Sequence, residues 1–393
     1  MSLTIESKLP LSGVSIFAQM TAAAIRNQAI NLAQGFPNFS PPSELFEFLN
    51  EAVLNGYNQY AAMPGLDLLR NQITQRIQCD YQFNANPDTE VTVTAGATQA
   101  IYTIISSIIQ PGDKALIFEP AYDSYGPSVL VNGGIPVYLR LELPDFKIPW
   151  DELETILKKE KIKIILINNP HNPAGRILTS EDIARIHQLT KDLNTLIIWD
   201  EVYDLLIFDQ LKHQSALLFP ELMDRSVIVF SMGKTLHNTG WKVGYTIANP
   251  KITNEIRKLH QFTVFSVNTP AQYAIAKFME TQSTFFNSLP AFYQQKRDYF
   301  FEKMKVLPFN WLPCEGSYFA LADYKHMSNL SDREYAMELV EKYKVAAIPL
   351  SPFYHDGYDP KLLRFCFAKN SETIDAAARQ LEITSSQIKI PNS

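Results

Sequence analysis

Short apolar runs rich in β-branched residues recur along the first 250 residues and alternate with longer stretches of mixed polarity. Residues 164–167 and 196–199 are apolar at every position, a pattern typical of strands covered on both faces. Such strands form a mostly parallel sheet wrapped by helices. We therefore predict an α/β fold with a mostly parallel sheet of about seven strands, near residues 90–94, 114–118, 135–139, 162–168, 195–199, 226–230 and 243–248.

The pattern changes after residue 285. An amphipathic helix is predicted at 292–306, with short strands near 318–322, 345–349 and 364–368 and helices near 332–343 and 371–383. The last ten residues show no such pattern and are expected to form a loose tail. We therefore predict two domains: a large α/β domain at 46–285, and a smaller α+β domain that combines 1–45 with 286–393.

The composition is that of a globular protein, with 46% hydrophobic and 19% charged residues. The formal net charge of -6 is spread without long runs of one sign, so neither nucleic acid nor an anionic membrane is expected as a partner. Residues 91–112 carry no charge and are long enough to span a bilayer, but they include several Thr, Ser and Gln residues. A strand, a glycine turn and a buried helix explain this stretch better.

The cysteines and the first residues bear on location. Cys79, Cys314 and Cys366 are widely separated, which fits neither a disulfide framework nor a paired-cysteine zinc site, and we expect buried thiols in a reducing compartment. Glu6 and Lys8 leave no apolar core for a signal peptide near the N-terminus. A cytoplasmic location is therefore expected.

Polar or turn-forming residues follow almost every predicted strand. In an open α/β sheet, ligands bind beyond the carboxyl ends of the strands. Residues 94–98 form a glycine turn that opens a helix, whose free backbone N–H groups are suited to a phosphate. The runs 119–125, 169–175, 200–203 and 231–245 add aromatic, amide, carboxylate and lysine side chains. Pyridoxal 5′-phosphate is a cofactor that needs all of these groups.

Lys234 lies in the most informative of these runs, between Ser231 and a second cation, Lys242. A lysine that follows an apolar strand is suited to bond covalently to the aldehyde of this cofactor and, once released, to move a proton. Asp200 at a buried strand end favours a protonated pyridine nitrogen, which makes the ring an electron sink. Ser231, Lys242 and the turn at Gly96 are suited to the phosphate.

Three more side chains complete this predicted cofactor site. Asn172 and Tyr203 are placed to hydrogen-bond the ring hydroxyl, and Tyr122 to stack on the ring. Each residue alone is a weak signal, since turns and Asn-Pro pairs are common in loops. Their conjunction predicts a pyridoxal phosphate enzyme acting on amino acids.

These motifs resemble those of class I aminotransferases of the aspartate-aminotransferase fold, which is fold type I of the pyridoxal phosphate enzymes. They are most similar to the kynurenine/glutamine aminotransferase group and to bacterial methionine aminotransferases. The resemblance extends over nearly the whole chain, through residues 31–39, 58–65, 266–272 and 364–369.

The resemblance implies roles for matching residues: Lys234, Asp200 and Tyr203 are catalytic, and Arg364 grips the substrate α-carboxylate, a bidentate task that lysine performs poorly. The residues implied to bind the cofactor are Ala97, Thr98, Tyr122, Asn172, Asp200, Tyr203, Ser231, Lys234, Lys242 and Tyr60, and those implied to bind the substrate are Gly35, Asn172, Arg364, Phe17 and Phe265. Tyr60 matches a tyrosine that reaches the phosphate of a neighbouring subunit. A homodimer with shared sites is therefore expected.

The same resemblance places apolar and aromatic residues around the substrate side chain: Ile16, Phe17, Tyr102, Tyr122 and Phe265. Methionine, phenylalanine, tyrosine or similar amino acids are expected as amino donors, with a 2-oxo acid as acceptor. Ser266 stands where animal kynurenine aminotransferases have a histidine, which disfavours kynurenine. No second arginine is evident for a side-chain carboxylate, which disfavours aspartate.

Other interpretations stay open. The same residues would serve β-elimination from a cysteine conjugate or cystathionine. Two further interpretations are disfavoured. A non-catalytic regulator of this fold usually carries a DNA-binding helix-turn-helix before it, and the residues before Gln34 are expected to be too few for one. A nicotinamide enzyme would need a G-x-G-x-x-G turn after a strand, which is absent. His171 and His237 are interpreted as structural, and no residue spacing predicts a metal site.

Overall fold

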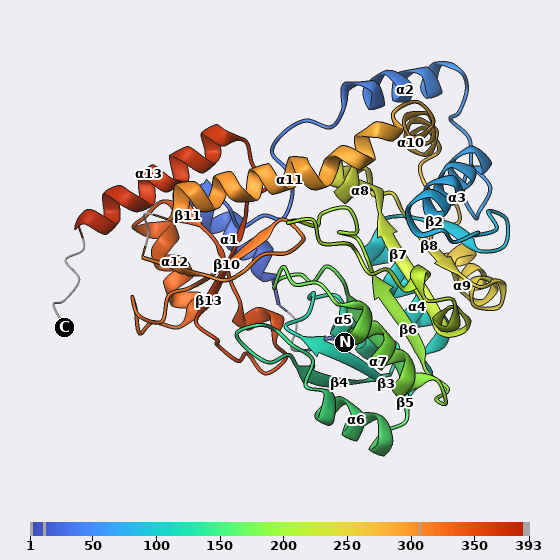
Figure 1. The fold of residues 1–393 in the computed structure, drawn as a ribbon, viewed down its shortest axis with the longest axis horizontal. Helices are drawn as coiled ribbons and strands as arrows, with labels where there is room; N and C mark the ends of the chain where they lie inside the picture. The colour runs from blue at the N-terminus through green and yellow to red at the C-terminus, as the bar shows by residue number, and fades with distance from the viewer. Residues whose placement is uncertain (1–2, 11–12, 306–307, 388–393) are drawn as a thin grey trace.

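The computed structural model describes residues 3–10, 13–305 and 308–387. Its largest sheet contains seven strands among these residues, in the order β2-β8-β7-β6-β5-β3-β4. All neighbouring pairs are parallel except those of β8, which is antiparallel to β2 and β7 (Figure 1). The predicted mostly parallel sheet is confirmed, with strands at β2 Val91–Thr94, β3 Lys114–Glu119, β4 Ile135–Arg140, β5 Ile162–Asn168, β6 Leu196–Asp200, β7 Ser226–Ser231 and β8 Gly244–Ala248.

Alternate residues of the central strands enter two separate apolar cores. Ile164 and Leu166 of β5 pack with α4, whereas Ile165 and Ile167 belong to the larger core on the opposite face. This arrangement explains the unbroken apolar runs, since both faces of the sheet are covered. The helices of this part are α2 Ser43–Leu54, α3 Asp67–Tyr81, α4 Ala97–Ile108, α5 Tyr125–Val131, α6 Trp150–Lys159, α7 Ser180–Thr190, α8 Met232–Thr235, α9 Pro250–Thr263 and α10 Thr269–Thr281.

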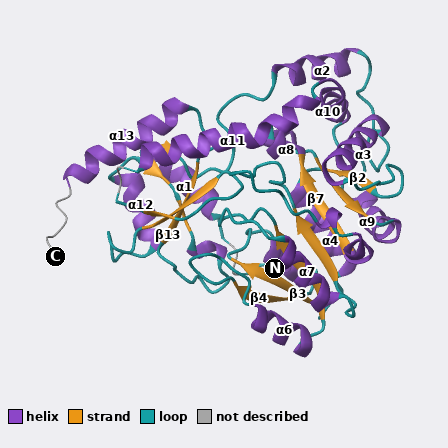
Figure 2. Ribbon diagram, in the orientation of Figure 1, coloured by secondary structure: helices purple, strands orange, loops and turns teal. Residues whose placement is uncertain are grey.

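A second group of elements forms the smaller α+β part (Figure 2). Its four-stranded sheet has the order β12-β13-β10-β9 and is antiparallel, while β1 pairs in parallel with β11. N-terminal and C-terminal residues therefore share one small sheet. The strands are β1 Ile30–Asn31, β9 Asn310–Trp311, β10 Phe319–Asp323, β11 Val345–Ala346, β12 Ile348–Pro349 and β13 Leu362–Cys366, and the helices are α1 Ile16–Arg26, α11 Ser283–Met304, α12 Asp332–Glu341 and α13 Ser371–Gln387.

Several details differ from the predictions. The single strand predicted at 345–349 is divided between two sheets, because Ala347 separates β11 from β12. The helix predicted to start at 292 starts at Ser283, because α11 continues through Pro290, a residue type that normally interrupts a helix. The predicted end of that helix, at 306, lies outside the described residues. The chain is helical to Gln387 where a tail was expected, and 388–393 also lie outside the described part.

Cys314 and Cys366 are buried as predicted, but Cys79 is exposed. It lies on α3, whose buried positions include Ile73, Ile77 and Tyr81, so it occupies the outward face of that helix. Within the described residues, no helix combines the length and apolar character needed to cross a bilayer.

Candidate active site

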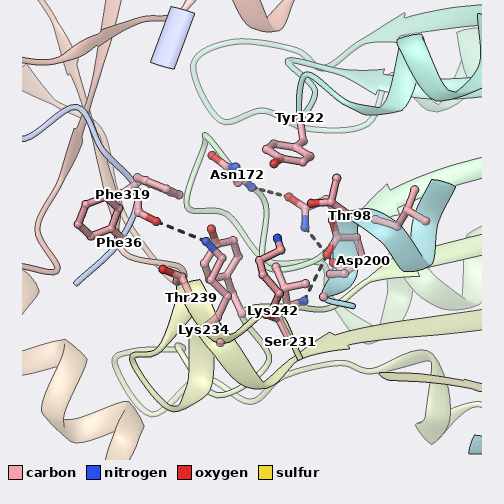
Figure 3. Close-up of a pocket in the computed structure, with 18 of the residues that line it drawn as sticks. Phe36, Thr98, Tyr122, Asn172, Asp200, Ser231, Lys234, Thr239, Lys242 and Phe319 are labelled. Atoms are coloured by element: carbon pink, nitrogen blue, oxygen red, sulfur yellow. Dashed lines mark hydrogen bonds between the residues drawn. The ribbon is translucent and has the colours of Figure 1, made fainter. Parts of the chain in front are cut away.

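A cavity of about 330 Å³ lies where the carboxyl ends of β5, β6 and β7 meet the start of α4. The small part of the molecule adds Gly35, Phe319 and Arg364 to the lining. In Figure 3, Phe36 and Phe319 lie together at one side of the cavity. The predicted site residues that line it are Phe17, Gly35, Ala97, Thr98, Tyr122, Asn172, Asp200, Tyr203, Ser231, Lys234, Lys242 and Arg364. The sequence motifs after separate strands are thus brought into one space.

Lys234 points into this cavity from the short helix α8, which begins directly after β7. Its Nζ donates to the Tyr318 hydroxyl at 2.8 Å and to the Gly35 carbonyl at 3.3 Å. Burial, the largest effect, lowers the pKa of Lys234 from 10.5 to about 8. About a tenth of this amine is therefore neutral, and nucleophilic, at pH 7.

Asp200 ends β6 and is buried. Its carboxylate accepts a hydrogen bond from the Tyr125 hydroxyl and a longer one, at 3.4 Å, from the Val202 backbone. Burial raises the pKa of Asp200 to about 6, and the bond from Tyr125 opposes that rise. A cationic group placed against this carboxylate would bring its pKa down again, so the site favours a protonated ring nitrogen.

The backbone at the start of α4 and the side chain of Lys242 together form one end of the cavity, here called the cradle. Gly96 has φ of +80, and a Cβ there would lie 3.3 Å from Nζ of Lys242. A Cβ on Gly244 would lie 2.7 Å from the Phe230 carbonyl and 3.0 Å from the backbone N of Ala97. These two glycines therefore let the backbone of β8 and the cation of Lys242 approach the N-terminus of α4. A helix start with a nearby lysine is suited to an anion such as phosphate.

Arg364 is buried on β13 and faces the cavity. Its Nη1 donates to Oδ1 of Asn172 at 2.8 Å and its Nη2 to the Ala33 carbonyl at 3.3 Å. The guanidinium carbon lies 3.8 Å from the centre of the Phe319 ring. Within the described residues, Nε has no hydrogen-bond partner and the side chain makes no ion pair. A buried guanidinium in this state is suited to a carboxylate ligand.

Tyr203, Tyr122 and Asn172 complete the predicted set. Tyr203 is buried edge-on against Tyr318, with ring centroids 5.1 Å apart. The backbone N of Asn172 donates to Oδ1 of Asn168 at 2.6 Å, which fixes the loop after β5. In Figure 3, Tyr122 and Asn172 lie on one side of the space, and Lys234 and Lys242 on the other.

Tyr60 and Phe265 do not line the cavity of their own chain. Their exposed fractions are 82% and 45%, and their rings meet edge-on at 5.4 Å on the surface. The structure also leaves Ile16 and Tyr102 out of the lining. Tyr102 on α4 and Phe265, two residues after the end of α9, are both exposed, so neither side chain contributes to the cavity of its own chain.

Three residues were missed in the sequence analysis: Asn168, which lines the cavity, and two tyrosines that hydrogen-bond lining residues, Tyr125 and Tyr318. Asn168 ends a predicted strand beside the Asn169-Pro170 pair, so its position was a usable signal. Tyr125 starts α5 three residues after Tyr122, and its backbone N–H closes the turn between them by donating to the Tyr122 carbonyl at 3.1 Å. Tyr318 lies 84 positions from Lys234, and no local pattern connects the two.

Both histidines of the motifs pack among protein groups. The His237 ring stacks on Phe292 at 5.5 Å and meets Phe39 edge-on. Burial lowers the pKa of His171 and of His237 to about 4, so both are neutral near pH 7. In the described part of the chain, no three His, Cys, Asp or Glu residues are grouped to hold a metal ion.

Comparison with known protein families shows which family shares this sequence. The family described as aminotransferase class I and II matches residues 27–381. The chain belongs to the class I and II aminotransferases. The predicted family is thereby confirmed, and the enzyme is an aminotransferase. The nicotinamide-dependent alternative finds no support in this assignment.

Relatives within the aminotransferases agree over nearly full length. The methionine aminotransferase of Escherichia coli is 44% identical over 376 residues, which cover 96% of this chain and 97% of the relative. The kynurenine–oxoglutarate transaminase of Dictyostelium discoideum is 31% identical, with 93% of each chain covered. A solved Escherichia coli structure, described as having a methionine aminotransferase function, superposes with a TM-score of 0.95 at 43% identity, covering 97% of this chain and 100% of that one. The aspartate aminotransferase of Thermus thermophilus, 21% identical, shares the fold with a TM-score of 0.88.

Proposed function

We propose that this aminotransferase moves the α-amino group of an apolar, sulfur-containing or aromatic amino acid to a 2-oxo acid. The observation that carries the proposal is buried Arg364, which has unused donor capacity and lies beside an apolar wall. Phe17, Phe36 and Phe319 supply that wall. The combination suits an amino acid whose carboxylate binds Arg364 and whose side chain is uncharged.

Pyridoxal 5′-phosphate is part of the proposal, because the residues present fit it. The cradle formed by Gly96, Gly244 and Lys242 suits the phosphate, and the buried carboxylate of Asp200 suits the ring nitrogen. When bound, this cofactor supplies an electron sink for charge developing at the substrate α-carbon.

Other residues hold the ring in place. Asn172 and Tyr203 are proposed to hydrogen-bond the ring hydroxyl, and Tyr122 to stack on the ring face. Asp200 keeps the ring nitrogen protonated, and Tyr125 orients its carboxylate. Ala97, Thr98 and Ser231 complete the phosphate contacts through backbone N–H and hydroxyl groups.

Lys234 is proposed to hold the cofactor covalently between turnovers and then to act on the α-proton. Its pKa of about 8 allows Nζ both to accept and to return a proton near neutral pH. The hydrogen bonds to Tyr318 and Gly35 restrain Nζ at the cavity wall opposite Tyr122. Arg364 and Asn172 orient the substrate carboxylate, which fixes where its α-carbon lies.

The lining also supports selectivity. Among the described residues that line the cavity, the cations are Lys234, Lys242 and Arg364. Each has a proposed partner, so none is left for an acidic side chain of the substrate. Methionine is the first donor to test, because the relative at 44% identity is a methionine aminotransferase. Ser266 still disfavours kynurenine.

Aminotransferases of this fold are usually dimeric, and we propose a homodimer that shares its sites. The exposed Tyr60 would contact the cofactor phosphate of the partner copy. Further apolar side chains are exposed on α2 and α9, among them Leu54 at 75% and Phe262 at 82%. Apolar surface of this kind is typical of an interface. A cytoplasmic location completes the proposal and accords with three free cysteines.

Purified holoenzyme mixed with methionine alone tests the reaction. A transaminase releases one 2-oxo acid per site and stops with its cofactor in the amine form, until a 2-oxo acid is added. Sustained release of pyruvate and ammonia from cystathionine, without amino transfer, would instead establish the β-lyase alternative. A panel of amino acids against several 2-oxo acids then ranks the donors, with aspartate and kynurenine expected to be poor.

A further inference from the structure

Residues Gln34, Gly35 and Phe36, here called the wall segment, form one side of the cavity. The segment follows the two-residue strand β1 and belongs to no strand itself. The Gly35 carbonyl faces the cavity, where it accepts hydrogen bonds from Lys234 and, at 2.6 Å, from the Tyr318 hydroxyl. A Cβ on Gly35 would lie 2.8 Å from the Phe319 ring, so the segment is packed closely on that side.

Lys369 holds the wall segment from the opposite side. Its Nζ donates to the Phe36 carbonyl at 2.8 Å and to the Gln34 carbonyl at 3.2 Å, on either side of Gly35. The same ammonium lies 5.0 Å from the centre of the Phe36 ring. Both carbonyls that flank Gly35 are therefore bonded to one side chain.

Packing alone does not explain why a charged residue is buried at position 369. The side chain is 3% exposed and makes no ion pair within the described residues. A buried ammonium without a carboxylate partner is unfavourable, whereas an apolar side chain of the same length would fill the space without that penalty. The charge is thus used to bind the two carbonyls of the wall segment.

Lys369 also connects the wall segment to the substrate carboxylate site. It lies five residues after Arg364, on the chain that continues from β13. Two backbone hydrogen bonds join the same stretch to residues that flank the wall segment. Cys366 N donates to the Leu32 carbonyl, and Asn38 N donates to the Ala368 carbonyl. One strand and its continuation therefore set both the position of Arg364 and the position of the apolar wall.

We propose that Lys369 is a positioning residue for substrate binding, which holds the wall segment at the distance from Arg364 that an amino donor requires. This inference rests on the proposed function. It assigns Lys369 to substrate affinity and leaves proton transfer to Lys234, because Lys369 donates only to the backbone of the wall segment.

The test uses Lys369→Met, which keeps the length and removes the donors. We expect KM for methionine to rise roughly tenfold, the effect of losing about one strong hydrogen bond, with kcat within about twofold of wild type. Lys361→Met is the matched control, since Lys361 also donates to two backbone carbonyls, those of Asn329 and Leu330, away from the cavity. It is expected to leave KM unchanged, and Lys369→Arg to recover most of the loss.

Equilibrium binding supplies a readout without turnover. In holoenzyme, 3-phenylpropionate reports on the carboxylate site and the wall together, whereas acetate reports on the carboxylate site alone. Lys369→Met is expected to weaken the first roughly tenfold and to leave the second unchanged. Equal loss for both ligands, a fall confined to kcat, or a KM shift equal to that of the control would overturn the proposal. Failure of the wild type to transfer amino groups, with 3-phenylpropionate binding intact, would instead refute the proposed function.

Discussion

Arg364, on β13 of the small part, donates a hydrogen bond of 2.8 Å to Asn172, on the loop after β5 of the large part. The proposed carboxylate-binding residue and a proposed cofactor-binding residue are thus directly bonded. Under the proposed function, this contact between residues 192 positions apart links the substrate-binding and cofactor-binding groups.

Arg364→Lys is expected to reduce kcat/KM for methionine about 100-fold, mainly through KM. Lysine keeps the charge but loses the planar pair of donors needed to bind a carboxylate and Asn172 together. Steady-state kinetics over a range of methionine concentrations measure the effect. Arg225→Lys is the control, because Arg225 bonds only the backbone carbonyls of residues 190, 191 and 193. A kcat/KM within threefold of wild type for Arg364→Lys would contradict the assignment.

Lys234→Met is expected to stabilise the cofactor-free protein at pH 7 by up to ~3 kcal/mol, because it removes a buried ammonium whose pKa is lowered to about 8. Between that pKa and the ordinary value of 10.5, the unfolded chain binds more protons than the folded one. The free energy of unfolding of the wild type therefore rises with pH across this window, and the stability advantage of the variant becomes smaller. Urea unfolding of both proteins at pH 7 and pH 10 measures this difference in free energy. A constant difference would show that Lys234 is not buried as a cation.

Gly244→Ala is expected to weaken pyridoxal 5′-phosphate binding at least about tenfold, since the added Cβ would collide with the Phe230 carbonyl and displace the start of α4. Titration of the cofactor-free protein, followed by visible absorbance, gives the dissociation constant. Gly240→Ala is the matched control, because a Cβ there meets no atom within 4 Å. Equal affinities for the two variants would rule out the proposed phosphate cradle.

Tyr60→Ala and Lys234→Ala are each expected to be nearly inactive as homodimers and to complement one another when mixed. If Tyr60 contributes to the partner's site, each mixed dimer contains one intact site out of two. Random reassembly makes about half of the dimers mixed, so about a quarter of wild-type activity is expected to return. Unfolding and refolding the two proteins together allows this exchange. No recovery, with mixed dimers detected by differential tags, would place Tyr60 outside the partner's site.

The predictions that succeeded depended on local patterns. Asp200, Asn172 and Ser231 each follow a strand that the apolar runs identify, and the carboxyl ends of parallel strands meet at one edge of a sheet. The same reasoning failed where a helix continued through Pro290, and it did not anticipate that Phe265 lies outside the cavity of its own chain. Both failures concern tertiary packing, which overrides the local preference of a residue.

The sequence by itself determined the α/β sheet, the family and most of the residues that line the cavity, because these follow from strand pattern and from motifs of adjacent residues. Only the tertiary structure decided which distant groups join them. Tyr318 reaches Lys234, and Lys369 reaches the wall segment, only where segments distant in the sequence pack together. Such contacts depend on how separate elements pack, and burial in that packing is also what moves the pKa values of Lys234 and Asp200.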